Sequence, residues 1–145
     1  MKDSFVIKPS DAIVSEVEQW FGFQDSDPIR IESDEIQHLV HNAQNVIFVE
    51  ATASGAERMQ KAISIIEEKA AALAPLCTLS SDTAYIIQFV DSPTDQMRVE
   101  ERAAVTEWLS SYQDGKDVAW GVSRRSTQED SVCIRMAISN LQMKI

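Results

Sequence analysis

Residues 45–59 read NVIFVEATASGAERM, and this stretch decides the fold. Residues 46–49 are four apolar side chains in succession, the pattern of a β-strand covered on both faces, so we expect this strand in the middle of a sheet. Ser54 and Gly55 then start the longest helix, which ends before Pro75 and whose apolar positions recur at intervals of three and four: Ala56, Met59, Ile63, Ile66, Ala70 and Leu73. This spacing predicts a helix that packs on the strand, with residues 46–49, Ile63 and Ile66 in one core.

Strand-like and helix-like segments alternate on both sides of this stretch. Short apolar runs predict strands at 4–8, 29–31, 84–90, 118–122 and 132–138, and helical periodicity predicts helices at 10–21, 34–43 and 100–112. The last two strands are joined by a short polar segment, 126–130, which favours an antiparallel hairpin. The sequence therefore predicts an α/β (α+β) fold in one domain, 1–145: a mixed sheet of about four main strands with helices packed on it.

Composition limits the classes of partner. The chain has 145 residues, 13 Lys and Arg against 23 Asp and Glu, and a formal net charge of −10. An acidic protein of this kind is repelled by phosphate backbones and anionic lipids, so nucleic acid and membrane surfaces are not expected as partners. There is no apolar run long enough to cross a bilayer, and we expect a cytoplasmic protein in which Cys77 and Cys133 are buried thiols.

The sequence carries no motif for a cofactor. Its four glycines do not cluster, whereas a loop that cradles phosphates needs several close together, so no nucleotide or other cofactor is expected. His38 and His41 are three residues apart on a predicted helix, but they lack a defined third ligand and are better explained as solvated side chains than as a metal site. Trp20, Trp108 and Trp120 fall on apolar faces and are assigned to the core.

Three segments together resemble the carboxy-terminal domain of the bacterial tubulin homologue FtsZ. In the first, a hydrophobic strand is followed by a small-residue turn and an alanine-rich helix, and the residues at the family's turn positions are Ala53, Ser54, Gly55, Glu57 and Arg58. The second, AYIIQFVDSPTDQMRVEERAAV at 84–105, is similar to the family's strand, polar turn and Glu-headed helix. The third, DVAWGVSRRSTQEDSVCIRMAIS at 117–139, is similar to its last two long strands. The resemblance covers about 28–139, preceded by a strand-helix extension, 1–27.

The resemblance implies the fold of the FtsZ activation domain without the GTPase half, since the glycine-rich nucleotide signature is absent. It also bears on the segment IRIESDEI at 29–36. In the family, two acids of the corresponding loop enter the next subunit's GTP site. The resemblance places Glu32 and Glu35 at these two positions, with Asp34 between them. Carboxylates at such a site would position water for hydrolysis. The competing explanation is that acids in the first turn of a helix are favoured by its dipole alone.

Two classes of function follow as expectations. The first is a non-catalytic protein-interaction or regulatory module related to FtsZ or tubulin-like filaments in bacterial cell division, whose partner is an FtsZ/tubulin-like GTPase or a second copy of the chain. The alternative is a small-molecule-binding or enzymatic domain that reuses the same fold. A broad apolar or acidic patch at a sheet edge favours the first, and a pocket lined by convergent polar groups with perturbed pKa values favours the second.

The missing glycine-rich loop yields the first testable prediction. The isolated chain is expected to bind neither GTP nor ATP, because no backbone cradle for a triphosphate is encoded in it. Calorimetric titration with Mg-GTP and Mg-ATP should give no saturable heat. A micromolar dissociation constant for either nucleotide would contradict the prediction.

Overall fold

The computed structural model describes residues 6–7, 13–40, 43, 45–73, 75–79, 83–112, 117–125 and 130–143. The helices are α1 (Ile13–Phe21), α2 (Ser33–Val40), α3 (Arg58–Ala71) and α4 (Val99–Ser110). The strands are β1 (Val6–Ile7), β2 (Val46–Ser54), β3 (Cys77–Thr78), β4 (Ala84–Asp91), β5 (Asp117–Arg124), β6 (Ser131–Ser139) and β7 (Gln142–Met143). Residues 4–5, 8, 10–12 and 41–42 of the expected elements lie outside the described residues. No described helix is long and apolar enough to cross a membrane.

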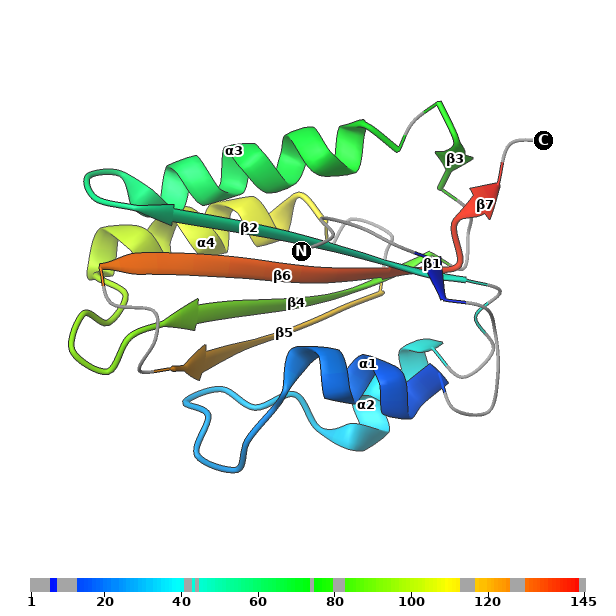
Figure 1. The fold of residues 1–145 in the computed structure, drawn as a ribbon, viewed down its shortest axis with the longest axis horizontal. Helices are drawn as coiled ribbons and strands as arrows, with labels where there is room; N and C mark the ends of the chain where they lie inside the picture. The colour runs from blue at the N-terminus through cyan, green and yellow to red at the C-terminus, as the bar shows by residue number, and fades with distance from the viewer. Residues whose placement is uncertain are drawn as a thin grey trace.

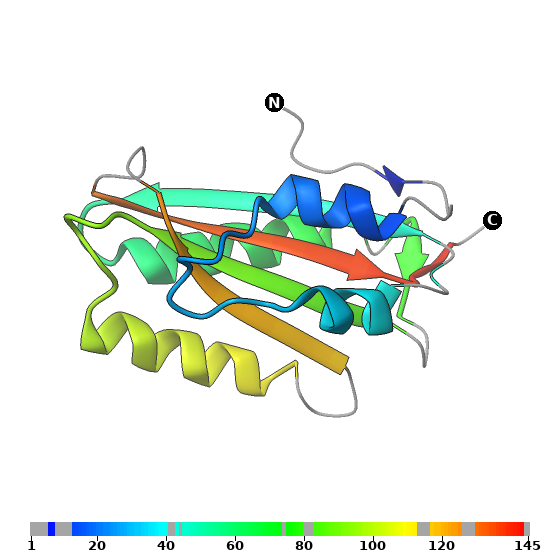
Figure 2. The ribbon, with the colours of Figure 1, turned by 90° about the horizontal axis from the view of Figure 1, so that it is seen from below.

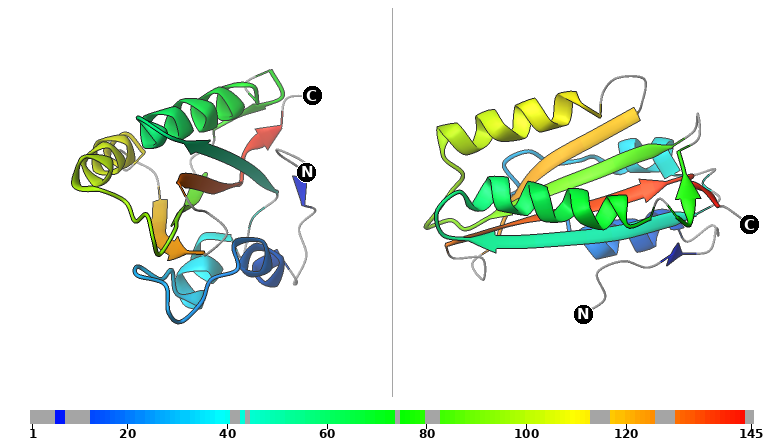
Figure 3. Two further views of the ribbon diagram at one scale, coloured as in Figure 1. Left: turned by 60° about the vertical axis from the view of Figure 1, so that its left-hand side comes forward. Right: turned by 90° about the horizontal axis from the view of Figure 1, so that it is seen from above.

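One mixed sheet forms the middle of three layers. Its strand order is β1-β2-β6-β4-β5, with β4 and β5 parallel and the other neighbours antiparallel. Helices α3 and α4 cover one face and α1 and α2 the other (Figures 1 and 2). The two views of Figure 3 show the same layers, together with the small pairing of β3 with β7 beyond the end of the sheet. The predicted α/β fold with a mixed sheet is confirmed.

The strand at 46–49 is buried on both faces, as its apolar run predicts, but its side chains feed two cores. Ile47 and Val49 pack with Ile66 of α3 on one face, whereas Val46 and Phe48 pack beneath α1 and α2 on the other. The expectation of a single core is therefore wrong for half of the run, because successive side chains of a strand point to opposite faces. The strand is interior but not the middle one: β6 holds the centre of the five-strand order, and β2 lies between β6 and the two-residue β1.

The expected hairpin of the last two strands is also wrong. Strand β5 pairs with β4 in parallel, and β6 pairs with β4 and β2, so β4 lies between the two strands that a hairpin would join. All eight residues of β4 are buried, and a strand this apolar must be covered by a neighbour at each edge and a helix layer on each face. The end of β5 and the start of β6 are therefore separated by the width of β4, two strand spacings or about 10 Å.

Helix α3 begins at Arg58, four residues later than the sequence suggested. Gly55 and Glu57 both have positive φ (78° and 56°), so the chain turns there instead of entering the helix, and Ala56 is exposed in the turn. The buried face of α3 consequently runs through Met59, Ala62 and Ile66. Ile63, Ala70 and Leu73 of the expected stripe are half-buried.

Arg58 is the largest fully buried side chain of the described residues, and it joins three segments. Its guanidinium donates to both carboxylate oxygens of Glu101 on α4 (2.7 and 3.1 Å), to the carboxylate of Asp95 (3.0 Å), and to the carbonyls of Asp95 and Gln96. Burial alone raises the pKa of Glu101, but the hydrogen bonds from Arg58 and from the Arg98 backbone outweigh it, so the pKa is lowered and the carboxylate stays ionised.

The outer edge of β2 is covered over a short length only. Within the described part of the chain, β1 pairs with Val46 and Ile47, and no strand continues along the edge towards Ser54. Lys69 of α3 reaches over this edge and donates from its Nζ to the carbonyl oxygen of Glu50 at 2.6 Å.

The contact between α3 and the sheet gives the second prediction. Ile66 is fully buried between α3 and the sheet, so Ile66→Ala should lower the free energy of unfolding by about 2–5 kcal/mol. Ile65→Ala on the same helix, at a half-buried position, is the matched control and should cost clearly less. Chemical denaturation measures both. A loss below about 0.5 kcal/mol for Ile66→Ala, which is the size of a typical surface substitution, would place this side chain outside the core.

Candidate functional site

A groove between α4 and the edge strand β5 is the candidate functional site. Its floor is made by Trp120 and Val122 of β5. Arg124 is the next alternate residue of this strand and stands at the rim, and all three point to the α4 side of the sheet. One wall is formed by the start of α4 and the turn before it, and the other by the segment that precedes α2. The full lining is Pro28, Ile29, Met97, Arg102, Val105, Thr106, Trp120, Val122 and Arg124, around a volume of about 390 Å³.

The outer wall is held against β5 by two backbone hydrogen bonds. The Ile29 N–H donates to the Val122 carbonyl at 3.2 Å, and the Val122 N–H donates to the Ile29 carbonyl at 2.8 Å. This approach depends on Gly121, because a Cβ there would lie 2.6 Å from the Ile29 carbonyl oxygen. The extended segment expected at 29–31 therefore adds a short antiparallel bridge to the sheet edge.

A buried polar cluster fixes the loop that leads into this wall. Asp27 accepts hydrogen bonds from the Gln24 backbone (3.0 Å), from the Ser123 hydroxyl (2.8 Å) and from the Arg125 guanidinium (3.1 Å). Ser123 in turn accepts from Gln88 of β4 at 2.8 Å. Since Asp27 directly precedes Pro28, the position of the wall is set by side chains of two strands.

The groove carries positive charge at its rim. Arg124 lies 3.1 Å from the carboxylate of the buried Asp91, which also accepts the backbone N–H of Met97 at 2.9 Å. Arg102 is exposed, and its side chain has no ion pair among the described residues. Arg102 thus presents an unneutralised guanidinium beside an apolar floor, in a protein whose net charge is −10.

The acids singled out in the sequence lie outside this groove. Glu32, Asp34 and Glu35 are all exposed at the start of α2, and the Glu35 carboxylate accepts the backbone N–H of Glu32 at 3.2 Å. This contact is that of a helix cap. Whether these acids also meet a partner's nucleotide stays a prediction. Glu35 borders a shallow depression with His38 and Asp117 at the start of β5, so the acids lie towards the other end of the same sheet edge.

The two histidines, His38 and His41, were considered as metal ligands in the sequence. His38 is exposed on α2, and His41 lies outside the described residues. Among the side chains that the structure describes, no group of three His, Cys, Asp or Glu is placed to hold a metal ion.

The sequence did not identify the groove residues as a site. Trp120 was assigned to the core and is only half-buried, as is Trp20, whereas Trp108 is buried as expected. The signal that was available is the alternation Trp120, Val122, Arg124, in which an arginine shares a strand face with two apolar residues. The contributions of Pro28, Met97 and Arg102 come from separate segments, and no local pattern connects them.

Comparison of the structure with known proteins places it beside FtsZ. An empty FtsZ dimer of M. jannaschii matches with a TM-score of 0.58 and 17% identity, over 80% of this chain and 33% of that chain. A tryptophan-to-tyrosine mutant of M. jannaschii FtsZ matches with a TM-score of 0.68 and 14% identity, over 92% of this chain and 42% of that chain. The chain thus spans less than half the length of either FtsZ chain.

At this identity the likeness concerns the fold. No protein-family model matches the sequence, and no curated protein matches it. The resemblance to FtsZ read from the three sequence segments is confirmed at the level of the fold: this chain has an α/β fold like that of the FtsZ carboxy-terminal domain.

The close approach at Gly121 gives the third prediction. Gly121→Ala should lower the free energy of unfolding by about 1–3 kcal/mol, because its methyl group collides with a backbone carbonyl that cannot move away as a side chain would. To make room for the methyl group, the whole segment at Ile29 would have to move away from β5. This movement would break the Ile29–Val122 bridge, so the amides of both residues should exchange faster with solvent. Ala119→Gly, two residues earlier on the same strand face, controls for changes in strand propensity. Unchanged exchange at Ile29 and Val122 would contradict this account of the wall.

Proposed function

We propose that this chain is a non-catalytic protein-interaction module that acts on FtsZ- or tubulin-like filaments, and that it binds its protein partner through the α4–β5 groove. The observation that carries the proposal is the composition of the groove, which combines a half-buried tryptophan, an exposed isoleucine and two arginines. Ile29, an apolar side chain of the groove, is 43% exposed.

The groove has the composition of an energetic centre in a protein interface. Aromatic residues and arginine are enriched in such centres, where an apolar floor takes an anchor side chain and the charged rim excludes water. Trp120 and Val122 supply the floor here, and Arg102 and Arg124 the rim. The partner segment is therefore expected to carry an apolar anchor followed by a carboxylate, which would pair with Arg102.

The filament partner is supported by the fold and by the position of the acids. If the likeness to FtsZ extends to assembly, the chain would dock on the end of a filament without offering a nucleotide of its own and would stop growth there. Glu32, Asp34 and Glu35 lie along the same sheet edge as the groove and would then approach the nucleotide of the terminal subunit. Self-association is the second candidate, because the arginine rim and the acidic start of α2 are of opposite charge on one molecule.

The fourth prediction tests the groove with the full chain. Light scattering and phosphate release from FtsZ of the organism that encodes this chain should change when the chain is added below stoichiometry. Arg102→Glu should weaken the effect at least tenfold, because it turns the attraction for a carboxylate into repulsion. Lys61→Glu is the matched control: it makes the same change of charge at an exposed site on α3, and it should leave the effect intact.

Three outcomes separate the alternatives. If the double variant Glu32→Gln/Glu35→Gln still changes filament mass but no longer changes the rate of phosphate release, the result supports the role of the acids near the nucleotide. Concentration-dependent sedimentation of the chain alone, abolished by Arg102→Glu, supports self-association. If the wild-type chain alters neither filament mass nor hydrolysis rate and remains monomeric, the interaction proposal fails.

A further inference from the structure

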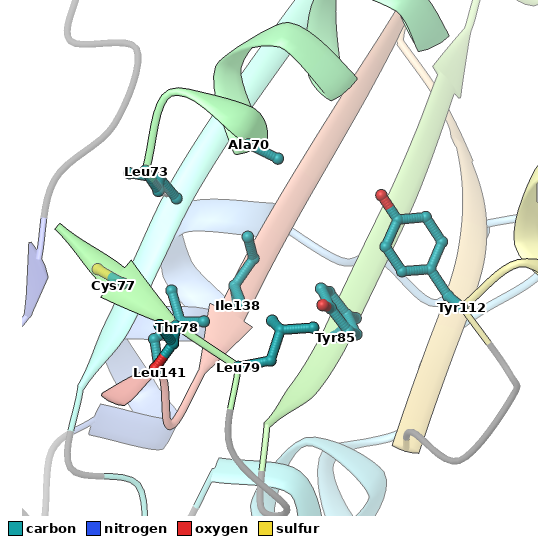
Figure 4. A pocket seen from close by; sticks show the side chains of 9 residues that line it. All are labelled: Ala70, Leu73, Cys77, Thr78, Leu79, Tyr85, Tyr112, Ile138 and Leu141. Atoms are coloured by element: carbon teal, nitrogen blue, oxygen red, sulfur yellow. The ribbon is translucent and has the colours of Figure 1, made fainter. Parts of the chain in front are cut away.

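A second pocket lies at the opposite end of the molecule and shares no residue with the α4–β5 groove. It is enclosed by the end of α3, the β3 segment, and the sheet face formed by β4 and β6 (Figure 4). Its volume is about 200 Å³. The lining is mainly apolar, with two tyrosines: Ala70, Leu73, Cys77, Thr78, Leu79, Tyr85, Tyr112, Ile138 and Leu141.

The two tyrosines differ in what their hydroxyls do. The Tyr112 hydroxyl donates to Oε1 of Glu67 on α3 at 2.7 Å. The same Glu67 oxygen accepts the indole N–H of Trp108. Figure 4 shows this hydroxyl directed towards α3. Tyr112 is thereby satisfied and fixed, and its ring meets that of Tyr85 edge to face with the centroids 4.7 Å apart.

Tyr85 has no such partner. Its side chain projects from β4 into the pocket, the residue is only 5% exposed, and no described residue forms a hydrogen bond with its hydroxyl. The hydroxyl oxygen keeps contact with solvent through the pocket, so its proton is available to a molecule that binds there. Burial, with a further contribution from Glu67, raises the pKa of Tyr85, so this hydroxyl remains protonated and can donate.

The size and charge of the pocket restrict what it can hold. An apolar cavity of about 150 Å³ is large enough for benzene, so this one has room for one ring and a small substituent. The Glu67 carboxylate next to the tyrosines and the net charge of −10 both oppose an anion. Leu79 forms the outer wall and is 56% exposed, so a bound molecule would also cover apolar surface that now faces water.

We infer that this pocket is a binding site for a small neutral aromatic compound with a carbonyl oxygen, which accepts the hydrogen bond of Tyr85 while its ring lies among the apolar side chains. The site belongs to the small-molecule class of function and stands independently of the α4–β5 groove.

The test uses acetophenone and toluene as probes in a chemical-shift titration of the full chain. Acetophenone should perturb the amides around Tyr85 and Ile138 with a dissociation constant on the order of 1 mM, as its nine heavy atoms permit. Tyr85→Phe should weaken acetophenone about fivefold, the loss of one hydrogen bond, and leave toluene within about twofold. Tyr112→Phe is the matched control and should leave the preference for acetophenone over toluene intact, because that hydroxyl is directed to Glu67.

Ala70→Leu tests the cavity itself, since the larger side chain fills it, and should abolish binding of both probes. Benzoate should bind at least tenfold more weakly than acetophenone. The inference is overturned if acetophenone perturbs no amide around the pocket at its solubility limit, if Ala70→Leu leaves its affinity unchanged, or if Tyr85→Phe weakens toluene as much as acetophenone. Should Ala70→Leu fail to fold, the comparison of the two probes in Tyr85→Phe decides alone.

Discussion

The ion pair between Arg58 and Glu101 is the interaction on which the rest of the arrangement depends. Both side chains are buried, so each charge has lost its hydration, and removal of either one would leave the other uncompensated in the interior. The pair joins the first residue of α3 to the first turn of α4, and the further bonds of Arg58 to Asp95 and Gln96 hold the turn before α4. That turn supplies the Met97 N–H to Asp91, which in turn pairs with Arg124. A single series of charged contacts thus runs from the helix layer to the rim of the α4–β5 groove.

Local periodicity was sufficient for the four long strands, the four helices and the fold class, but not for the short strands β3 and β7 or for the order of the strands. The apolar runs at β2, β4 and β6 each predict a buried strand, because burial can be inferred from the side chains of a single segment. Strand order depends on which segment covers which edge, and β4 takes the place between β5 and β6 because its burial on all sides leaves it no edge position. The start of α3 was placed too early for a related reason: the backbone torsions of Glu57, and not its side chain, delay the helix.

Neither pocket could be assembled from the sequence, since each is made by segments that are distant along the chain. Arg58 was singled out only as part of a resemblance, and nothing local distinguishes an arginine that is fully buried from one that is solvated. Tyr85 presented the same difficulty. An aromatic residue in a buried strand is normally core, and its hydroxyl differs only in having no hydrogen-bond partner among the described residues. The acids at the start of α2 were visible in the sequence because a helix cap is a local motif.

The edge of β2 has a consequence for how the protein behaves at high concentration. Among the described residues, only β1 covers this edge, beside Val46 and Ile47. A strand edge that remains unpaired is a template on which another chain can extend the sheet, which is a common route to aggregation. Lys69 places a charged amine on the Glu50 carbonyl, at the position where an incoming strand would form its hydrogen bond. The Lys69 amine therefore occupies a backbone acceptor of β2, and its removal would leave that carbonyl open to pairing with another strand.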